Sequence, residues 1–389
     1  IKPLLVATPP SAAQVAAGVR LCSEARATVI PWGGGSAMAL GNPPRQGGVV
    51  LKTVGLDRVI EHDAANLTVT AQSGITMNAL QSALAAQKQF VPIDPPFSAR
   101  ATLGGTVAAN LNGARRGFYG SVRDLVIGMK VVLASGEAIK AGGKVVKNVA
   151  GYDMCKLFTG SLGTLGIITE VTVRIVPMAE SAATFIAHGT AAHAKRFIEE
   201  LSHSRLLPAA VFLVREKAPK DWRIGAWCEG FTETVERHLR EFQAAAGRLG
   251  MTQDVARDEN HVQFWHAVSD LPLKPDHIVY RVTLPRTAIF DFLERIEDWN
   301  STEIASDASM GTIWLVFPAN KTALARFSEI ERMAREWRGH AVVFSAPAVL
   351  KAAVDVWGTS SPTLSLMREI KTRFDPHELL NPGRFVGGL

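Results

Sequence analysis

The chain has 389 residues, of which 47% are hydrophobic and 20% are charged. This composition excludes a disordered, collagen-like or coiled-coil protein, and the length suggests two or three domains with cores of their own. Lys and Arg number 42 against 36 Asp and Glu, for a net charge of +6. The basic residues are scattered, with Arg115-Arg116 as the densest cluster, so the charge does not indicate nucleic-acid binding.

Direct membrane insertion and export are not indicated either. No run approaches the ~18 apolar residues of a membrane helix, and the start of the chain lacks a basic segment followed by an apolar one. A removed leader stays open, because the chain begins at Ile1 rather than Met. The three cysteines, Cys22, Cys155 and Cys228, are isolated and form no CxxC. They fit a reducing, cytoplasmic compartment and predict no iron–sulfur cluster or zinc ribbon held by this chain alone.

Residues 1–178 are rich in Gly, Val and Ala, with short apolar runs between turn signals. Such runs predict strands, here at 29–30, 49–51, 67–70, 126–133 and 167–176. Apolar periodicity predicts two helices, 12–25 and 77–87. The stretch 103–120 holds five glycines and two asparagines and is predicted to be irregular. A domain boundary is expected after residue 178, since Pro177 closes the last strand.

Residues 179–345 have a different pattern, in which helices and strands alternate with short connections. We expect an α+β domain around an antiparallel sheet, with helices at 191–201, 233–248, 288–299 and 324–337 and strands at 210–214, 224–228, 278–284, 312–317 and 341–344. The tail, 346–389, carries one predicted helix, 364–374, followed by Asp375-Pro376 and an Asn-Pro-Gly-Arg turn. Helix, stop and turn at a C-terminus predict a segment that returns to the first domain.

Three glycine-containing segments carry the first functional signal. Pro31-Trp32-Gly33-Gly34-Gly35-Ser36 follows a strand, and its glycines allow successive N–H groups to converge on an anion such as a pyrophosphate. ATLGGTVAAN (101–110) and GSLGTLGIIT (160–169) are the other two. Neither GxGxxG nor GK[ST] is present, so a nicotinamide-type or P-loop site is not indicated. Each segment alone could be a turn; the three together favour a nucleotide cofactor.

These segments resemble a known family when read with RRGFYGSVRDLVIG, KNVAGYD and the closing FDPHELLNPGRF. The combination is similar to the FAD-binding domain of the vanillyl-alcohol oxidase superfamily, and more narrowly to the FAD-binding E subunits of bacterial glycolate oxidases. The resemblance spans nearly the whole chain. It implies an α+β fold, with a two-part FAD-binding domain at 1–178, a cap domain with an antiparallel sheet at 179–345, and a tail at 346–389 that returns to the FAD domain.

The resemblance also implies which residues meet the cofactor. The diphosphate and ribityl chain would lie against a set of small residues: Pro31, Trp32, Gly33, Gly34, Gly35, Ser36, Ala37, Thr102, Gly104, Gly105, Ala109, Asn110, Gly120 and Ser121. Adenine would pair with the main chain around Gly166 and Ile168. The flavin would be approached by Asp94 and Pro95 and by Asn381 and Arg384 of the tail. Residues 33–38 contain no His or Cys, so the FAD is expected to be non-covalent.

The chain departs from active hydroxy-acid oxidases of this family at the substrate site. In place of the metal-binding HAGDGNxH segment we read Arg338-Gly339-His340, no Glu-His pair occurs at 355–363, and Val268 stands where relatives place a carboxylate-binding arginine. We therefore expect no metal. Arg281 remains as a candidate for the substrate carboxylate, or as a solvated strand residue, and His340 as a candidate for the hydroxyl proton.

The favoured function is the FAD-binding subunit of a glycolate or 2-hydroxy-acid dehydrogenase complex. Its partners would be a second flavoprotein and an iron–sulfur subunit, through which a cytoplasmic chain could lie at the inner membrane, and its substrate a small 2-hydroxy acid. A free-standing dehydrogenase of another alcohol or hydroxy acid is the alternative. The non-enzymatic alternative is an assembly subunit in which FAD serves only the structure.

Overall fold

The computed structural model describes residues 2–144, 152–215, 221–299, 303–359 and 362–389. Most of the KNVAGYD segment lies outside them. The chain divides into two units: residues 1–112, 120–178 and 351–389 form the first, and 113–119 with 179–350 form the second. One division falls after Met178. A later division falls after Leu350, and no feature of the sequence indicated that 113–119 belongs to the second unit.

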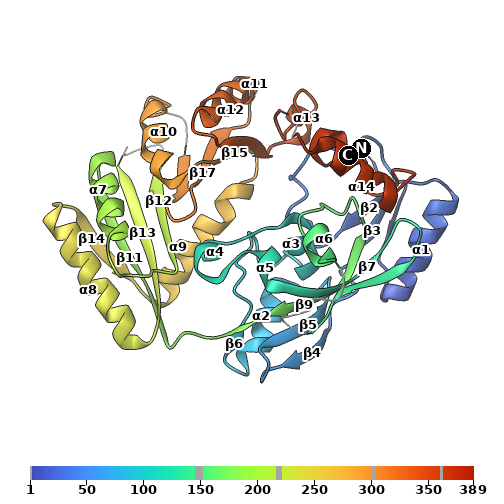
Figure 1. Ribbon diagram of the computed structural model, residues 1–389, viewed down its shortest axis with the longest axis horizontal. Helices are drawn as coiled ribbons and strands as arrows, with labels where there is room; N and C mark the ends of the chain where they lie inside the picture. Colours follow the sequence, from blue (N-terminus) through green and yellow to red (C-terminus); the bar gives the residue numbers. More distant parts are fainter. Residues whose placement is uncertain (1, 145–151, 216–220, 300–302, 360–361) are drawn as a thin grey trace. The chain divides into compact units, whose positions relative to one another are not determined.

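The first unit contains two main sheets (Figure 1). A parallel sheet of order β1-β3-β2 consists of β1 (Leu5–Ala7), β2 (Val29–Trp32) and β3 (Val49–Lys52). An antiparallel sheet of order β4-β5-β9-β7-β8 consists of β4 (Val59–Asp63), β5 (Thr68–Gln72), β7 (Val126–Val132), β8 (Ala138–Gly142) and β9 (Ile167–Arg174). A short pair, β6 (Gln89–Phe90) with β10 (Val176–Pro177), completes the strands of this unit in the described residues. This is the two-part, mixed architecture that the sequence predicted.

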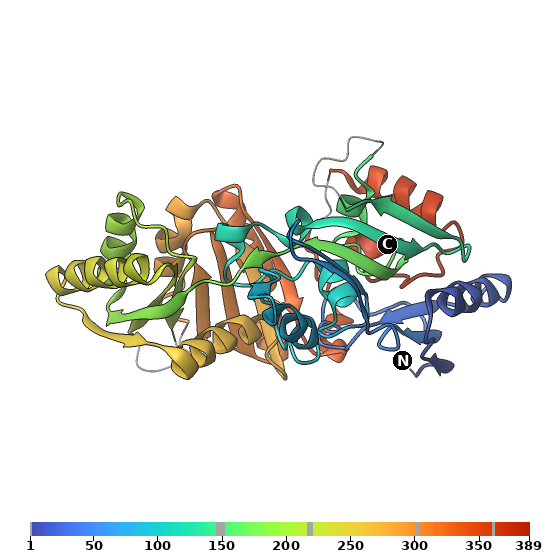
Figure 2. The ribbon, with the colours of Figure 1, turned by 90° about the horizontal axis from the view of Figure 1, so that it is seen from below.

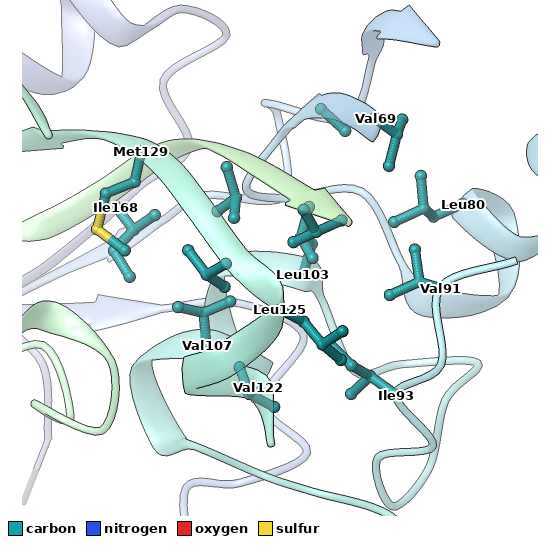
Figure 3. Packing of buried hydrophobic residues seen from close by; sticks show 14 of the residues in the cluster. Val69, Leu80, Val91, Ile93, Leu103, Val107, Val122, Leu125, Met129 and Ile168 are labelled. Carbon is teal, nitrogen blue, oxygen red and sulfur yellow. The ribbon is translucent and has the colours of Figure 1, made fainter. Parts of the chain in front are cut away.

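The helices of the first unit pack on these sheets. They are α1 (Ala12–Glu24), α2 (Met77–Ala85), α3 (Leu103–Ala109), α5 (Val122–Leu125), α6 (Met154–Phe158) and, from the tail, α14 (Leu364–Phe374). Figure 3 shows Leu103, Val107 and Val122 of the helices gathered with Met129 and Ile168 of the antiparallel sheet. Burial of this apolar cluster fixes α3 against the sheet, which places the start of α3 beside the glycine segments.

The prediction that 103–120 is irregular was wrong. Residues 103–109 form α3, and 116–119 form α4 (Arg116–Tyr119). The helix forms despite its glycines because the Thr102 hydroxyl accepts a hydrogen bond from the Gly105 N–H at 3.3 Å and caps its start. Gly104 is needed there, since a Cβ on it would lie 2.5 Å from the Cβ of Ser73. Tertiary contact thus overrides the low helix propensity of glycine.

The tail returns to the first unit as expected. The Val29 N–H donates to the Leu379 carbonyl at 2.8 Å, and the Asn381 N–H donates to the Val29 carbonyl at 3.0 Å. Leu380 therefore lies beside β2 in parallel and is fully buried. A short helix, α13 (Ala348–Lys351), precedes these contacts, and a 3-10 turn (Val386–Gly388) ends the chain.

The second unit is built on an antiparallel sheet of order β14-β11-β13-β12-β16-β17-β15-β18. Its strands are β11 (Ser181–Gly189), β12 (Ala210–Arg215), β13 (Trp222–Gly230), β14 (Thr252–Ala256), β15 (His277–Thr283), β16 (Glu303–Asp307), β17 (Thr312–Pro318) and β18 (His340–Ser345). The expected antiparallel sheet is present, and the sequence missed β11, β14 and β16. These have few apolar runs between turn signals and form by pairing with stronger neighbours.

Helices cover both faces of this sheet. On one face lie α7 (Ala191–Ser202), α8 (Thr232–Arg248), α10 (Ile289–Arg295), α11 (Lys321–Ala325) and α12 (Phe327–Glu336). Figure 2 shows α8 and α9 (Asp258–Asp270) on opposite sides of the strands between them. Helix α9 was not predicted, and the helix predicted at 324–337 is divided into α11 and α12 at Arg326. The face under α9 is the one that carries polar residues, described below.

Candidate functional site: a glycine-lined cavity and a charged sheet face

A cavity in the first unit, here the glycine cavity, is formed by three loop segments and the tail. It is lined by residues 31–38, from the end of β2 into the loop that follows, by part of α3 with Thr102, by the turn leading into β9, and by Asn381 and Arg384. Ile167 and Ile168, the first residues of β9, line the cavity. They precede Glu170, where β9 begins to pair with β5. The three glycine segments therefore meet, although they lie far apart in the sequence.

The glycines are required by the packing of the loop itself. A Cβ on Gly34 would lie 1.6 Å from the carbonyl oxygen of Arg100, and one on Gly33 would lie 2.3 Å from the Thr102 hydroxyl oxygen. Gly35 has a φ of +74°, which L side chains rarely adopt. A side chain at Gly34 would therefore strike the backbone beneath the loop.

Most of the sequence-predicted cofactor residues line this cavity: Pro31, Trp32, Gly33, Gly34, Gly35, Ser36, Ala37, Thr102, Gly104, Gly105, Ala109, Gly166, Ile168, Asn381 and Arg384. Five do not: Asp94, Pro95, Asn110, Gly120 and Ser121. Ser121 donates its N–H and hydroxyl to Asp124 at 2.9 and 2.6 Å, a capping role for α5. Asn110 ends α3 in a left-handed conformation. Sequence reasoning missed Met38, Thr53, Ala108, Leu162, Gly163 and Ile167.

Two buried cations of the tail hold the segment that follows the first glycine loop. The Arg384 guanidinium donates to the carbonyls of Met38 and Leu40 at 3.2 and 2.5 Å. The Lys351 ammonium donates to those of Ala39 and Gly41, both at 2.8 Å. Four successive carbonyls are thereby fixed by side chains more than 300 positions away. No local signal in the sequence marked Lys351.

A third buried cation holds the last glycine segment. Lys371 donates to Asp375 at 2.6 Å and to the carbonyls of Thr164 and Leu380 at 2.8 and 3.0 Å. Asp375 also accepts from the N–H groups of Leu379 and Leu380, so the pair shapes the turn after α14. The i, i+4 spacing of Lys371 and Asp375 at the end of a predicted helix was the one available signal.

The second unit carries a polar sheet face, here called the arginine face, defined by Arg281, Trp314, Asp307, Phe344 and His340. In the sheet register Arg281 pairs with Trp314 on one side and Val342 on the other. Directly paired residues of an antiparallel sheet share a face, as do residues two apart. The Arg281 guanidinium lies 5.2 Å from the ring centre of Phe344, and its Nε is buried without a hydrogen-bond partner. Burial and the nearby Arg116 lower the pKa of Arg281 to about 10.

Asp307 is the acidic group of this face. It is 5% exposed, and one carboxylate oxygen accepts from the N–H and hydroxyl of Ser309 at 2.9 and 2.6 Å and from the N–H of Met310 at 3.2 Å. Its second oxygen makes no hydrogen bond within the described residues. Burial raises the pKa of Asp307 to about 6, against the lowering effect of these hydrogen bonds and of Arg116.

Two other residues that the sequence analysis singled out, His340 and Val268, also lie in this unit. His340 is the first residue of β18, opposite Thr283; the residue is exposed overall, but partial desolvation of its ring and the charge of Arg281 lower its pKa. Val268 is buried in α9 and packs in a cluster with Phe212, Phe264 and Trp265. That position is therefore filled by the hydrophobic core of the unit.

The Arg115-Arg116 pair explains why 113–119 belongs to the second unit. Arg115 donates to Glu229 of β13 at 2.9 Å in a buried ion pair, and its guanidinium lies 4.3 Å from the ring centre of Trp227. Tyr119 donates its hydroxyl to the same carboxylate. Arg116 is exposed, and its charge acts on both Arg281 and Asp307. The sequence noted this pair only as a basic cluster.

Comparison with known proteins assigns the chain to a family. A model of the FAD binding domain matches residues 3–142, and a model of the C-terminal domain of FAD linked oxidases matches residues 358–385. The chain is 30% identical to the glycolate oxidase subunit GlcD of Bacillus subtilis, over 98% of this chain and 88% of that protein. It belongs to the FAD-linked oxidases of the vanillyl-alcohol oxidase type. It is accordingly an FAD-dependent oxidoreductase, as the sequence predicted.

Further members of this FAD-linked oxidase family are similar along most of their length. The glycolate oxidase subunit GlcE of Escherichia coli is 29% identical over 85% of each chain, and a D-lactate dehydrogenase of Archaeoglobus fulgidus is 27% identical over 99% of this chain and 92% of its own. Among solved structures, an alkyldihydroxyacetonephosphate synthase matches with a TM-score of 0.72 at 17% identity, over 97% of this chain and 76% of that one. This last likeness concerns the fold.

Two absences complete the description. Within the described residues, no group of three or more His, Cys, Asp or Glu side chains could hold a metal ion. No helix in that part of the chain is long and apolar enough to cross a membrane.

Proposed function

We propose that FAD binds non-covalently in the glycine cavity, with its diphosphate against the Trp32–Ala37 loop and α3. Two features of the cavity support this placement. The glycines leave backbone rather than side chains at the surface, and the buried Oδ1 of Asn381 has no partner in the described residues while its Nδ2 donates to Leu162 at 2.7 Å. Adenine would lie near Ile168. Acid precipitation should release the yellow colour into the supernatant; colour kept in the pellet would mean a covalent link.

We further propose that the chain oxidises a small 2-hydroxy acid, with Arg281 holding its carboxylate. Arg281 carries this proposal: it is half-buried, its buried Nε has no hydrogen-bond partner, and a guanidinium in such a place is costly unless an anion pairs with it. No described carboxylate forms an ion pair with it. FAD, when bound, would supply the chemistry of an acceptor for the hydride at C2 of the hydroxy acid. The names of the relatives, which include glycolate, D-lactate and D-2-hydroxyglutarate enzymes, agree with this substrate class.

Within this function, Asp307 is a better acceptor of the hydroxyl proton than His340. Asp307 and His340 stand at the two ends of one row across β16, β17, β15 and β18, on the face that carries Arg281. His340 is exposed, whereas Asp307 is buried, keeps one oxygen unpartnered, and has a pKa raised to about 6. A buried carboxylate near neutrality suits a general base.

We also propose that the chain works as one subunit of a dehydrogenase complex, on the cytoplasmic side, together with a second flavoprotein and an iron–sulfur protein that takes the electrons. The similar glycolate oxidase proteins are named as subunits. The core position of Val268 supports slow turnover by the chain alone, because the second carboxylate-binding arginine expected in active relatives is missing. Co-purification of the tagged chain with an iron–sulfur protein would test this.

The test of the substrate proposal is anaerobic mixing of the FAD-loaded chain with glycolate and with D-lactate, followed by the flavin absorbance. We expect slow reduction by at least one of them, and a further loss of about 10²-fold in Arg281→Met, with partial recovery in Arg281→Lys. Arg248→Met is the control, since Arg248 is an exposed arginine of the same unit. Equal reduction in Arg281→Met and the parent would remove Arg281 from the site. FAD that no hydroxy acid reduces would favour an assembly subunit.

A further inference from the structure

Arg384 and Lys351 are buried cations without a carboxylate partner. Their side chains are 5% and 4% exposed, and each makes its hydrogen bonds in the described residues to carbonyl oxygens of 38–41. Neither forms an ion pair in that part of the chain. Lys371, by contrast, is equally buried but is paired with Asp375 at 2.6 Å. The two cations behind the first glycine loop therefore lack the compensation that the third one has.

Such an arrangement calls for an anion. Burying a charge is expensive unless it is paired, and two like charges on one four-residue segment add to the cost. Among the described residues that line the glycine cavity, Arg384 is the one charged side chain. The loop itself offers an anion backbone N–H groups and the uncharged side chains of Trp32 and Ser36. A diphosphate in this cavity would bring two negative charges to the segment that these two cations hold.

We propose that Arg384 and Lys351 form the charged part of the cofactor's diphosphate site, and that binding of the diphosphate is coupled to protonation of Lys351. This rests on the placement of FAD in the glycine cavity. Arg384 lines the cavity directly, whereas Lys351 is a positioning residue that acts through the carbonyls of Ala39 and Gly41. The sequence motif supplies the shape of the site, and the tail supplies its charge.

The charged surroundings of Lys351 give the coupling its direction. Burial and the charge of Arg384 lower the pKa of Lys351 from 10.5 to about 8. The other ionic groups on these segments are occupied elsewhere: Asp355 accepts from Asn42 at 3.0 Å, and Arg45 pairs with Glu378 at the surface. An anion raises the pKa of a neighbouring ammonium. FAD affinity should therefore be highest below pH 8 and decrease as pH rises from 8 through the pKa of Lys351 in the FAD-bound protein.

The same group has the opposite effect on the stability of the FAD-free protein. Because the folded pKa lies below the unfolded one, the contribution of Lys351 to the free energy of unfolding increases as pH rises from 8 to 10.5. If Lys351 only tied the loop to the tail, FAD affinity would increase with pH together with this stability. Opposite trends of affinity and stability therefore distinguish the proposed role from a structural one.

The experiment is calorimetric titration of FAD into the FAD-depleted full chain at pH 7.5 and pH 9, in buffers of different ionisation enthalpy. We expect up to one proton taken up per FAD at pH 9 and weaker binding there than at pH 7.5. Lys351→Met should lose the proton uptake and bind about 10- to 100-fold more weakly at pH 7.5. Lys351→Arg should keep the affinity without the pH dependence. Arg384→Met should also bind more weakly.

Lys130→Met is the matched control, because Lys130 is an exposed lysine of the same unit, paired with Glu170; it should behave as the parent. ADP, which has the diphosphate without the flavin, should show the same proton uptake. Equal proton uptake in Lys351→Met and the parent would overturn the inference while leaving the cavity as the FAD site. Failure of the parent to bind FAD would overturn both. If Lys351→Met is unstable, Lys351→Arg and the pH trends still decide.

Discussion

The glycine cavity and the arginine face differ in which atoms are available to a ligand. At the cavity, the charged side chains are turned toward backbone carbonyls, and glycines leave N–H groups and carbonyls at the surface. At the arginine face, charged side chains project from strands, and Arg281 keeps a buried Nε without a partner. In the glycine cavity, charged side chains hold the backbone of the loop in place. In the arginine face, the backbone of the strands positions the charged side chains.

Because of this difference, we expect the two regions to tolerate substitutions differently. The cavity depends on close backbone approach, which a single added carbon can destroy, because backbone cannot move aside as a side chain can. The arginine face depends on the identity of a few side chains on a regular sheet, which can be exchanged without disturbing the strands. The proposed cofactor site of this chain is therefore set by shape, and its proposed substrate site by residue type.

The largest effect is expected from Gly34→Val, which should remove both FAD and the folded first unit. Its Cβ would lie 1.6 Å from the Arg100 carbonyl oxygen, so the loop has to leave its position. Thermal unfolding and FAD content are the measurements. Gly247→Ala is the control, since nothing lies within 4 Å of its added Cβ and helix propensity favours Ala by ~1 kcal/mol. A Gly34→Val protein with normal FAD content would contradict the close packing described for the loop.

The next largest effect on stability is expected from breaking the buried ion pair of each unit in turn. Asp375→Asn removes the carboxylate partner of Lys371 in the first unit, and Glu229→Gln removes the Glu229 carboxylate from Arg115 in the second; each should cost about 3–5 kcal/mol of unfolding free energy. Urea denaturation measures this loss. We expect Asp375→Asn to lose FAD and Glu229→Gln to keep it. Arg248→Met, which breaks an exposed pair with Glu200, should cost ~1 kcal/mol or less.

Asp307→Asn tests the arginine face through pH. The raised pKa of about 6 means that the carboxylate is ionised, and able to accept a proton, above pH 6 but not below. Flavin reduction by the hydroxy acid should therefore slow as pH falls through 6 in the parent. In Asp307→Asn it should be about 10²-fold slower and lack this pH dependence. The amide keeps one oxygen for Ser309, so the fold is retained. A parent-like pH profile in the variant would exclude Asp307 as the base.

The smallest effect is expected from removing metal ions. Chelation should leave FAD content, thermal stability and the rate of flavin reduction unchanged, because the described residues of the arginine face offer one carboxylate and one imidazole at opposite ends of a row of strands. The measurements are flavin absorbance and the melting temperature before and after chelation. A drop restored by zinc or manganese would show that these groups bind a metal after all.

The sequence marked the residues of the glycine cavity more clearly than those of the arginine face. Glycine at 33–35 and the run from Thr102 are local signals, because close backbone approach requires glycine wherever it occurs. The partners of these segments were not local. Lys351 and Lys371 are ordinary lysines in the sequence, and only the folded tail brings them to carbonyls of the glycine segments.

Asp307 illustrates why the rest could not be predicted. Its strand, β16, has too few apolar residues to be recognised, and its position opposite Thr312 depends on pairing with β17. His340 was favoured instead, because histidine alone among side chains titrates near neutrality in water. Burial in the folded sheet raised the pKa of a carboxylate into the same range.

The sequence by itself determined the glycine turns, the FAD cofactor and the family, since these follow from backbone requirements carried by adjacent residues. The tertiary structure decided which charges are buried and what they face. It assigned 113–119 to the second unit through the Arg115–Glu229 pair, and it placed Arg384 and Lys351 behind the first glycine loop. The energy of a charge depends on its surroundings in space, and those come from residues hundreds of positions away in the chain.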